Sequence, residues 1–242
     1  MRISFTHPYC WPHVRRGSER QIEIIANWLG SRGHEVTFYS THPEHAAVER
    51  MAYGRRVLAR ARRGLRSLRI DERHTFLWTA FRQLSKDDSQ VIHSFYYTDS
   101  LAASACRARS ARVLQLHGVA IPGVSCRRFL PPEASMLRSA LKRADAVVTC
   151  SAFIGDLIEQ HYGVRARVIA SAVDQQAWPL GYGRPDGRPV ILAAADFTVR
   201  RKGVRPLVRA FALLLEEVPE ACLRLSGHLP EAARGLSKMG FK

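Results

Sequence analysis

The sequence predicts an α/β protein built around parallel β-sheets. Short apolar runs, each long enough for one strand, alternate along the chain with segments whose apolar residues recur at helical spacing. Strands separated by helices indicate right-handed crossovers, which produce a parallel sheet with helices on both faces. We therefore expect a Rossmann-like N-terminal domain, followed by an incomplete second domain of the same kind.

The expected elements of the first domain follow one another from the N-terminus. Apolar residues from Ile22 to Leu29 share one face of the first helix, and Gly33 is a suitable residue to end it. Strands are expected at residues 2–6, 35–39, 91–93, 112–116, 146–149 and 167–170, and helices at 18–32, 100–109, 132–143 and 153–162.

The second domain is expected to be short. Residues 173–189 are rich in Gly and Pro and break the alternating pattern, which is typical of a linker. An apolar run at 190–195 suits a strand buried on both faces, and a helix from Val204 and a strand at 222–226 follow. A single strand–helix–strand unit leaves sheet faces uncovered. We therefore expect an N-terminal domain at 1–175, a linker at 176–188 and a partial C-terminal domain at 189–242.

The composition is that of a globular protein with an excess of arginine. The hydrophobic content is 46% and the charged content 24%, but the formal net charge is +16 with only five lysines. Such a chain attracts phosphates, anionic lipid surfaces or nucleic acid. Nucleic acid is the least expected of these partners, because the arginines are not interleaved with aromatic residues in a known binding module.

The cysteines and the lack of long apolar segments indicate the cellular compartment of the protein. The five cysteines are widely spread and form no C-x-x-C pair, which is typical of a reduced compartment without structural zinc. The N-terminus lacks a signal-peptide core, and no segment approaches the roughly 18 apolar residues of a membrane span. We expect a cytoplasmic protein that needs no metal, with contact to the inner face of the plasma membrane left open.

The strongest candidate for an anion site is the cationic loop of Arg200, Arg201 and Lys202. It lies between the apolar run 190–195 and the helix from Val204, and therefore at the carboxyl end of a strand and the amino end of a helix. Free backbone N–H groups and the helix dipole favour anions at this position, so the three cations are suited to clamp a diphosphate. The alternative is an ordinary solvated cluster of charges.

Two further residues are candidates because of their positions. Gly17 precedes the first helix next to Ser18, a suitable N-cap, and would let a ligand approach the backbone; an ordinary capped helix start is an equal alternative. His117 follows the strand 112–116, where open parallel sheets bind ligands. Its imidazole could bond a sugar hydroxyl or a leaving phosphate, or be merely structural. His93 ends another strand and is expected in the core or behind the site.

The densest basic segment, residues 50–69, is expected to form an amphipathic helix. Its apolar face is expected to pack on the domain core, which we favour over contact with an anionic membrane. Motifs of other enzyme classes are absent. The first loop lacks the G-x-G-x-x-G of NAD(P) dehydrogenases, and the sequence contains no D-x-D, H-E-x-x-H, G-x-S-x-G or P-loop pattern.

Several landmarks in order resemble one family, the retaining glycosyltransferases of the GT-B fold, family four, also called glycosyl transferase group 1. The resemblance covers nearly the whole chain. The landmarks are Met1-Arg2-Ile3 with Pro8-Tyr9-x-x-Pro12-His13, Gly17-Ser18-Glu19-Arg20, Ser31-Arg32-Gly33-His34-Glu35-Val36-Thr37, Val91-Ile92-His93-Ser94, Leu114-Gln115-Leu116-His117-Gly118, Ala144-Asp145-Ala146-Val147-Val148, Val168-Ile169, Val173-Asp174 and Arg201-Lys202-Gly203.

The resemblance implies a GT-B-like fold and a sugar transfer from a nucleotide-diphosphate-sugar donor. The donor would be held mainly by the second domain and a lipid, polysaccharide or small-molecule acceptor by the first, with no required metal or other cofactor. Lys202 and Arg201 would then neutralise the departing diphosphate, Gly17 would admit the phosphates, and His117 would face the reacting sugar. Arg200 would replace a cation that the family usually carries nearby.

The sequence also departs from the family pattern. The usual paired glycines of the first loop are Arg16-Gly17 here, Asp196-Phe197 replaces a Gly-Arg pair, and the family's paired glutamates would lie beyond Lys242. These departures leave a second hypothesis open, a truncated and inactive GT-B remnant that binds anionic membranes or nucleic acid through its basic surface.

Overall fold

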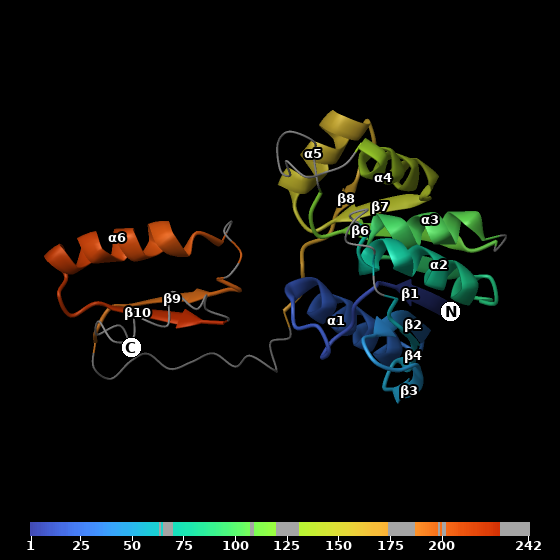
Figure 1. The fold of residues 1–242 in the computed structure, drawn as a ribbon, viewed down its shortest axis with the longest axis horizontal. Helices are drawn as coiled ribbons and strands as arrows, with labels where there is room; N and C mark the ends of the chain where they lie inside the picture. Colours follow the sequence, from blue (N-terminus) through green and yellow to red (C-terminus); the bar gives the residue numbers. More distant parts are fainter. Residues whose placement is uncertain are drawn as a thin grey trace. The chain divides into compact units, whose positions relative to one another are not determined.

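The computed structural model describes residues 1–62, 64, 70–106, 109–119, 131–173, 187–197, 199 and 202–227, without the side chains of residues 131 and 132. The chain divides into two compact units, Met1–Trp178 and Pro179–Lys242 (Figure 1). Residues 174–186, which include most of the expected linker, lie outside the described residues.

The first unit is built on one twisted sheet. Its described strands have the order β3-β4-β2-β1-β5-β6-β7-β8, and all neighbours are parallel except the antiparallel pair β3 and β4. The parallel sheet with helical crossovers confirms the predicted fold class. The strands are β1 (Arg2–Thr6), β2 (Glu35–His42), β3 (Ala47–Met51), β4 (Gly54–Arg60), β5 (Val91–Ser94), β6 (Ala111–Leu116), β7 (Ala146–Thr149) and β8 (Arg167–Val168).

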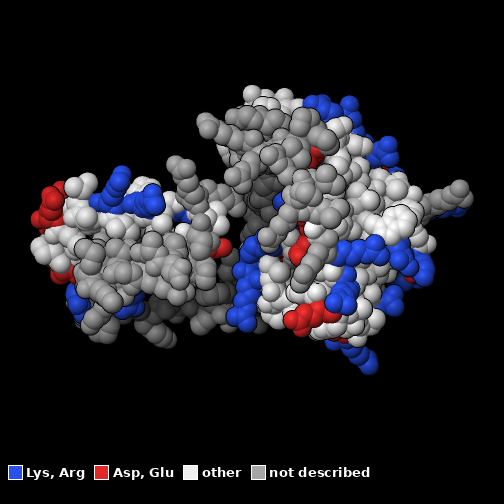
Figure 2. Space-filling model, viewed as in Figure 1, with Lys and Arg blue, Asp and Glu red and all other residues white. Residues whose placement is uncertain are grey.

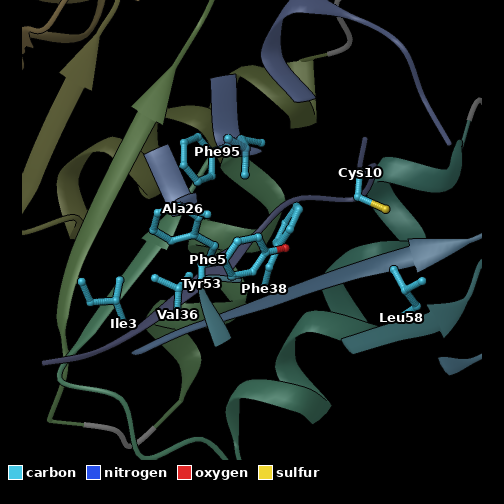
Figure 3. Packing of buried hydrophobic residues seen from close by; sticks show 10 residues of the cluster. Ile3, Phe5, Cys10, Ala26, Val36, Phe38, Tyr53, Leu58 and Phe95 are labelled. Carbon is cyan, nitrogen blue, oxygen red and sulfur yellow. The ribbon is translucent and has the colours of Figure 1, made fainter. Parts of the chain in front are cut away.

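Helices cover both faces of this sheet. Successive residues of a strand point to opposite faces. Phe38 of β2 lies in one core cluster with Ile22 of α1, whereas Tyr39 lies in another with Leu84 of α2. Figure 3 shows the first cluster, in which Phe5 and Phe38 are completely buried. The helices are α1 (Gly17–Ser31), α2 (Glu72–Leu84), α3 (Tyr97–Ala105), α4 (Pro131–Arg143) and α5 (Ala152–Tyr162).

The prediction of a basic helix over residues 50–69 is wrong for its described part. Residues 47–60 form β3 and β4 instead, joined by a turn that ends at Gly54, whose φ of +135° few other residues adopt. The reason is tertiary, because the buried Arg56 of β4 ion-pairs with Glu23 of α1 at 2.9 Å and with Glu49 of β3 at 3.1 Å. Residues 63 and 65–69 lie outside the described residues.

Helix α2 is an element that the sequence analysis did not predict. Its N-cap is Asp71, whose carboxylate accepts a hydrogen bond from the backbone N–H of Arg73 at 3.0 Å. The return bond of the capping box comes from a histidine, His74, rather than from the usual Glu or Gln. Phe76 and Ala80 are buried and lie in one cluster with Ala102 of α3.

The described part of the second unit is a strand–helix–strand unit. β9 (Val190–Ala194) and β10 (Cys222–Ser226) are parallel and joined by α6 (Val204–Glu217). The prediction that this first strand is buried on both faces is wrong, because Ile191 is 37% exposed and Leu192 66% exposed. The physical reason is that α6, the one helix described in this unit, covers a single face of its two strands (Figure 1).

The surface carries the excess of basic residues. On the face of Met1–Trp178 that is seen in Figure 2, Lys and Arg side chains cover more of the surface than Asp and Glu. Among the described residues, no helix has both the length and the apolar character that crossing a bilayer requires. Cys10, Cys106, Cys150 and Cys222 are free thiols, and Cys126 lies outside the described residues.

Two helical glycines differ in the room around them and give a test of the packing. A Cβ on Gly30 of α1 would lie 2.6 Å from the Cα of Tyr53, whereas a Cβ on Gly155 of α5 would meet its nearest neighbour at 3.6 Å. We expect Gly30→Ala to lower the free energy of unfolding by about 1–3 kcal/mol because the backbone must shift. Gly155→Ala should raise it by up to about 1 kcal/mol through helix propensity. Urea denaturation measures both, and equal effects would contradict this packing.

Candidate functional site at the carboxyl edge of the sheet

Three neighbouring strands of the first unit end at the same place. β1, β5 and β6 are adjacent and parallel, so their carboxyl ends meet at one edge of the sheet. His7 follows β1, Phe95 follows β5 and His117 follows β6. The start of α1 returns to this edge through the loop 7–16. Open parallel sheets bind ligands at their carboxyl edges, which makes this the candidate site.

His117 lies at this edge in a stack of aromatic rings. Its ring is nearly parallel to that of Phe95, with an interplanar angle of 12° and centroids 6.3 Å apart. Phe95 in turn stacks on His93 at 4.3 Å. The Nε2 atom of His117 is buried and has no hydrogen-bond partner among the described residues. The stack therefore restrains the imidazole, and the described residues do not use the hydrogen-bonding capacity of its Nε2 atom.

Burial keeps the two histidines of the edge neutral. Burial lowers the pKa of His117, and the carboxylate of Glu19 opposes this shift. Burial also lowers the pKa of His7 to about 4, against the opposing effects of the Tyr9 backbone and Glu19. Both imidazoles are thus uncharged near neutral pH, and their nitrogens can donate or accept hydrogen bonds.

Glu19 is a buried carboxylate that the sequence analysis did not select. Its side chain is 1% exposed in the first turn of α1, where the helix dipole favours a negative charge. It ion-pairs with Arg16 at 3.1 Å and accepts a 2.8 Å hydrogen bond from the hydroxyl of Ser18. The negative charge of Glu19 acts on both His7 and His117.

The helix start at Gly17 differs from the expected one in its cap. The N-cap is Arg16, which makes no side-chain capping bond, and Ser18 lies inside the helix, so the prediction of Ser18 as N-cap is wrong. The hydroxyl of Ser18 is instead engaged by Glu19. A Cβ on Gly17 would meet no described atom within 4 Å. Packing within the protein therefore does not require this glycine, and its backbone is open to an approaching ligand.

A second buried carboxyl group, that of Asp99, ties β1 and β5 together behind the site. Its Oδ2 accepts hydrogen bonds from the Thr6 hydroxyl at 2.8 Å and from the Phe95 backbone N–H at 3.2 Å. Thr6 also bonds the hydroxyl of Ser94 at 3.0 Å. Burial raises the pKa of Asp99 to about 8, against the effect of these bonds. Asp99 therefore shares with the Thr6 carbonyl, at 3.1 Å, the backbone N–H of Phe95, on whose ring His117 stacks.

The cationic loop of the second unit is described only in part. Arg200 and Arg201 lie outside the described residues. Lys202 is exposed, its backbone N–H donates to the carbonyl of Val199 at 2.9 Å, and Gly203 caps α6 in a left-handed conformation. Lys202 thus lies between β9 and the amino end of α6, as the sequence predicted. Its role in binding phosphate stays a prediction.

The matches to known proteins identify the family. Residues 15–177 match the model of Glycosyltransferase Family 4. A glycogen synthase of Mycobacterium tuberculosis is 22% identical over 262 residues, which cover 94% of this chain and 61% of that protein. This chain therefore belongs to glycosyltransferase family 4, and it spans about 61% of the length of the curated relatives that it matches.

Solved structures of similar fold match nearly the whole of this chain. The sucrose-phosphate synthase of Thermosynechococcus elongatus has a TM-score of 0.73 at 15% identity over 98% of this chain and 66% of its own. A structure described as trehalose-6-phosphate from Escherichia coli, bound with UDP-2-fluoro glucose, has a TM-score of 0.66 at 11% identity. The match covers 98% of this chain and 68% of that chain. The predicted GT-B-like, Rossmann-like fold is confirmed.

The buried carboxyl of Asp99 should make the stability of the protein depend on pH. Its pKa in the folded state, about 8, lies above that in the unfolded state, so folding takes up a proton between these values. This contribution is complete below about pH 4 and is lost as the pH rises through 8. Asp99→Asn keeps an acceptor oxygen but cannot ionise, so the loss of stability from about pH 5 to pH 8 should be smaller in the variant.

Urea denaturation of both proteins at the two pH values measures this difference. Comparison with the variant removes the contributions of His7 and His93, which are the same in both chains. A parallel pH dependence of the two proteins would show that Asp99 is ionised in the fold.

Proposed function

We propose that this protein transfers a sugar from a nucleotide-diphosphate-sugar donor to an acceptor, with retention of the anomeric configuration. The observation that carries the proposal is the neutral His117 at the carboxyl edge of a family-four sheet, whose Nε2 atom has no hydrogen-bond partner among the residues that the structure describes. Structural neighbours include Anabaena HepE in complex with UDP-glucose, with a TM-score of 0.57 at 16% identity over 99% of this chain and 64% of that chain.

In this proposal the first unit supplies the groups that contact the reacting sugar. His117, held by its stack on Phe95, offers Nε2 to a sugar hydroxyl. Glu19 stabilises a partial positive charge on the imidazole, and Arg16 compensates the carboxylate. Gly17 admits a phosphate group to the amino end of α1, where free backbone N–H groups favour anions. These residues orient the sugar and stabilise charge as it develops.

The second unit, in the same proposal, binds the departing diphosphate. Lys202 supplies positive charge at the amino end of α6, where the helix dipole adds to it, and Arg200 and Arg201 directly precede it in the sequence. Such cations stabilise a leaving group without a cofactor. We assign acceptor binding to residues 1–175 and donor binding to residues 189–242, on the basis of the family resemblance.

The acceptor class remains broad in this proposal. The relatives are named as synthases of glycogen, sucrose phosphate and trehalose phosphate, so their products range from a polysaccharide to phosphorylated sugars. A lipid, a polysaccharide and a small molecule are therefore all kept as acceptors. A cytoplasmic location and contact with an anionic membrane surface stay predictions from the sequence.

Donor binding tests the role of the cationic loop. Lys202→Ala should weaken the binding or turnover of a nucleotide sugar by about 2–4 kcal/mol, because a charge-assisted contact to phosphate is lost. Lys142→Ala removes an exposed lysine from α4 and is the matched control. The measurement is calorimetric titration of the full chain with UDP-, GDP- and ADP-glucose, together with transfer assays. Equal affinities of Lys202→Ala and the control would reject this role.

Salt-dependent binding to anionic vesicles or DNA without donor binding would favour an inactive anion-binding protein.

The pH profile of transfer tests the coupling of Glu19 to His117. Glu19→Gln removes a charge that raises the pKa of His117, so the pKa of the imidazole should fall further below its ordinary value. If transfer needs neutral His117, the acid limb of the rate profile moves to lower pH in the variant. Glu35→Gln, at an exposed position at the start of β2, is the control. An unmoved acid limb in Glu19→Gln contradicts the coupling.

A further inference from the structure

Three imidazole rings outside the site just described meet at the carboxyl end of β2. His42 is the last residue of β2, His45 follows it in the next loop, and His13 comes from the loop after β1. The ring of His42 lies 4.4 Å from that of His13 and 3.7 Å from that of His45, measured between centroids. His13 and His45 are exposed, so this imidazole cluster is open to solvent.

The hydrogen bonds of His42 fix which of its nitrogens carries a proton. The Nδ1 atom accepts hydrogen bonds from the backbone N–H groups of Glu44 at 3.2 Å and His45 at 3.4 Å. The proton of the neutral ring is therefore on Nε2, which points away from the turn as a donor. A metal ion would need the lone pair of Nε2, and the described residues contain no group of His, Cys, Asp or Glu side chains arranged to hold one.

The surroundings of the cluster favour an anion. Arg60 of β4 pairs in register with His42, so its side chain leaves the same face of the sheet beside it. The nearby carboxylate of Glu49 is already paired with Arg56, and Glu44 is an exposed carboxylate of the same turn. Burial is the main cause that lowers the pKa of His13, and His42, Arg56 and His45 lower it further. The carboxylate of Glu49 has the opposite effect. A bound anion would remove this repulsion between the imidazoles.

The loop that carries His13 also carries His7 of the candidate active site. The hydroxyl of Thr41 in β2 donates to the carbonyl of Pro8 at 2.6 Å and so holds this loop against the end of β2. β1 and β2 are adjacent and parallel, which puts the imidazole cluster on the same edge of the sheet as His7. A ligand that extends from the candidate active site at His7 to the imidazole cluster can carry an anionic group at the cluster.

We propose that His13, His42 and His45 bind the phosphate group of a phosphorylated acceptor. The claim that the bound phosphate belongs to an acceptor rests on the proposed function. The claim that the cluster binds an anion rests on the three imidazoles alone. The Nε2 proton of His42 donates to a phosphate oxygen, and the exposed rings of His13 and His45 offer N–H groups to the other oxygens. The arrangement selects a phosphomonoester over an uncharged sugar.

Calorimetric titration of the full chain with glucose 6-phosphate, glucose and sulfate tests the subsite. Wild type should bind glucose 6-phosphate and sulfate about tenfold more tightly at about pH 6 than at about pH 8, because imidazoles gain charge in this range. Glucose should show no such increase in affinity. Sulfate is needed because it keeps its charge over this range, whereas a phosphate ester loses its second proton near pH 6. Titrations in two buffers of different ionisation enthalpy should report proton uptake on binding.

The exposed histidines allow variants that keep the fold. His13→Gln and His45→Gln should each weaken anion binding about fivefold or more and reduce the proton uptake, in line with the loss of one charge-assisted hydrogen bond. His161→Gln in α5, at the other end of the sheet, should bind as wild type does. Wild-type affinity in both cluster variants, or stoichiometric zinc binding that His42→Gln abolishes, would overturn the proposal. Anion binding at the cluster in a chain that transfers no sugar would support the anion site and reject the proposed function.

Discussion

The candidate site depends on one buried carboxyl group. Asp99 accepts hydrogen bonds from the side chain of Thr6 and from the backbone of Phe95, and so joins the ends of β1 and β5. This junction adds to the bond from the Phe95 backbone N–H to the Thr6 carbonyl at 3.1 Å, and so helps to hold the residue on whose ring His117 stacks. A buried carboxyl group is costly unless it is neutral or well bonded, so this site is maintained at the expense of stability at high pH.

The same edge of the sheet shows how burial sets the chemistry of a site. His7 and His117 are neutral because burial lowers the pKa of each, and Glu19 limits the shift. A neutral imidazole can donate to one hydroxyl and accept from another, which suits the handling of a sugar. The chain belongs to a glycosyltransferase family, and these groups lie where parallel sheets bind ligands.

Much of the fold could be predicted from the sequence, and the failures have physical reasons. β7 is a largely apolar run and β1 alternates apolar and polar residues, so the sequence predicts both strands. β4 was not predicted, because its buried Arg56 looks like a surface residue until Glu23 and Glu49 are known to be its partners. Helix α2 begins with a capping box that uses His74 in place of the usual residue.

Candidate site residues could be predicted from the sequence where they directly follow a predicted strand. His117 directly follows a strand and lies at the carboxyl edge of the sheet, while its role stays a prediction. His93 is expected in the core or behind the site, and its ring stacks on Phe95. Glu19 and Asp99 were missed because a carboxylate in the first turn of a helix is usually an exposed one. The Thr6 hydroxyl that bonds Asp99 lies 93 residues away in the sequence, so this partner cannot be read from the residues around Asp99.

The most direct test of the account is an NMR titration of the His117 imidazole with and without UDP-glucose. The account predicts a pKa below the ordinary histidine value of about 6.5, and a change in the His117 resonances when the nucleotide sugar binds. An ordinary pKa together with resonances that do not respond to saturating nucleotide sugar would contradict it.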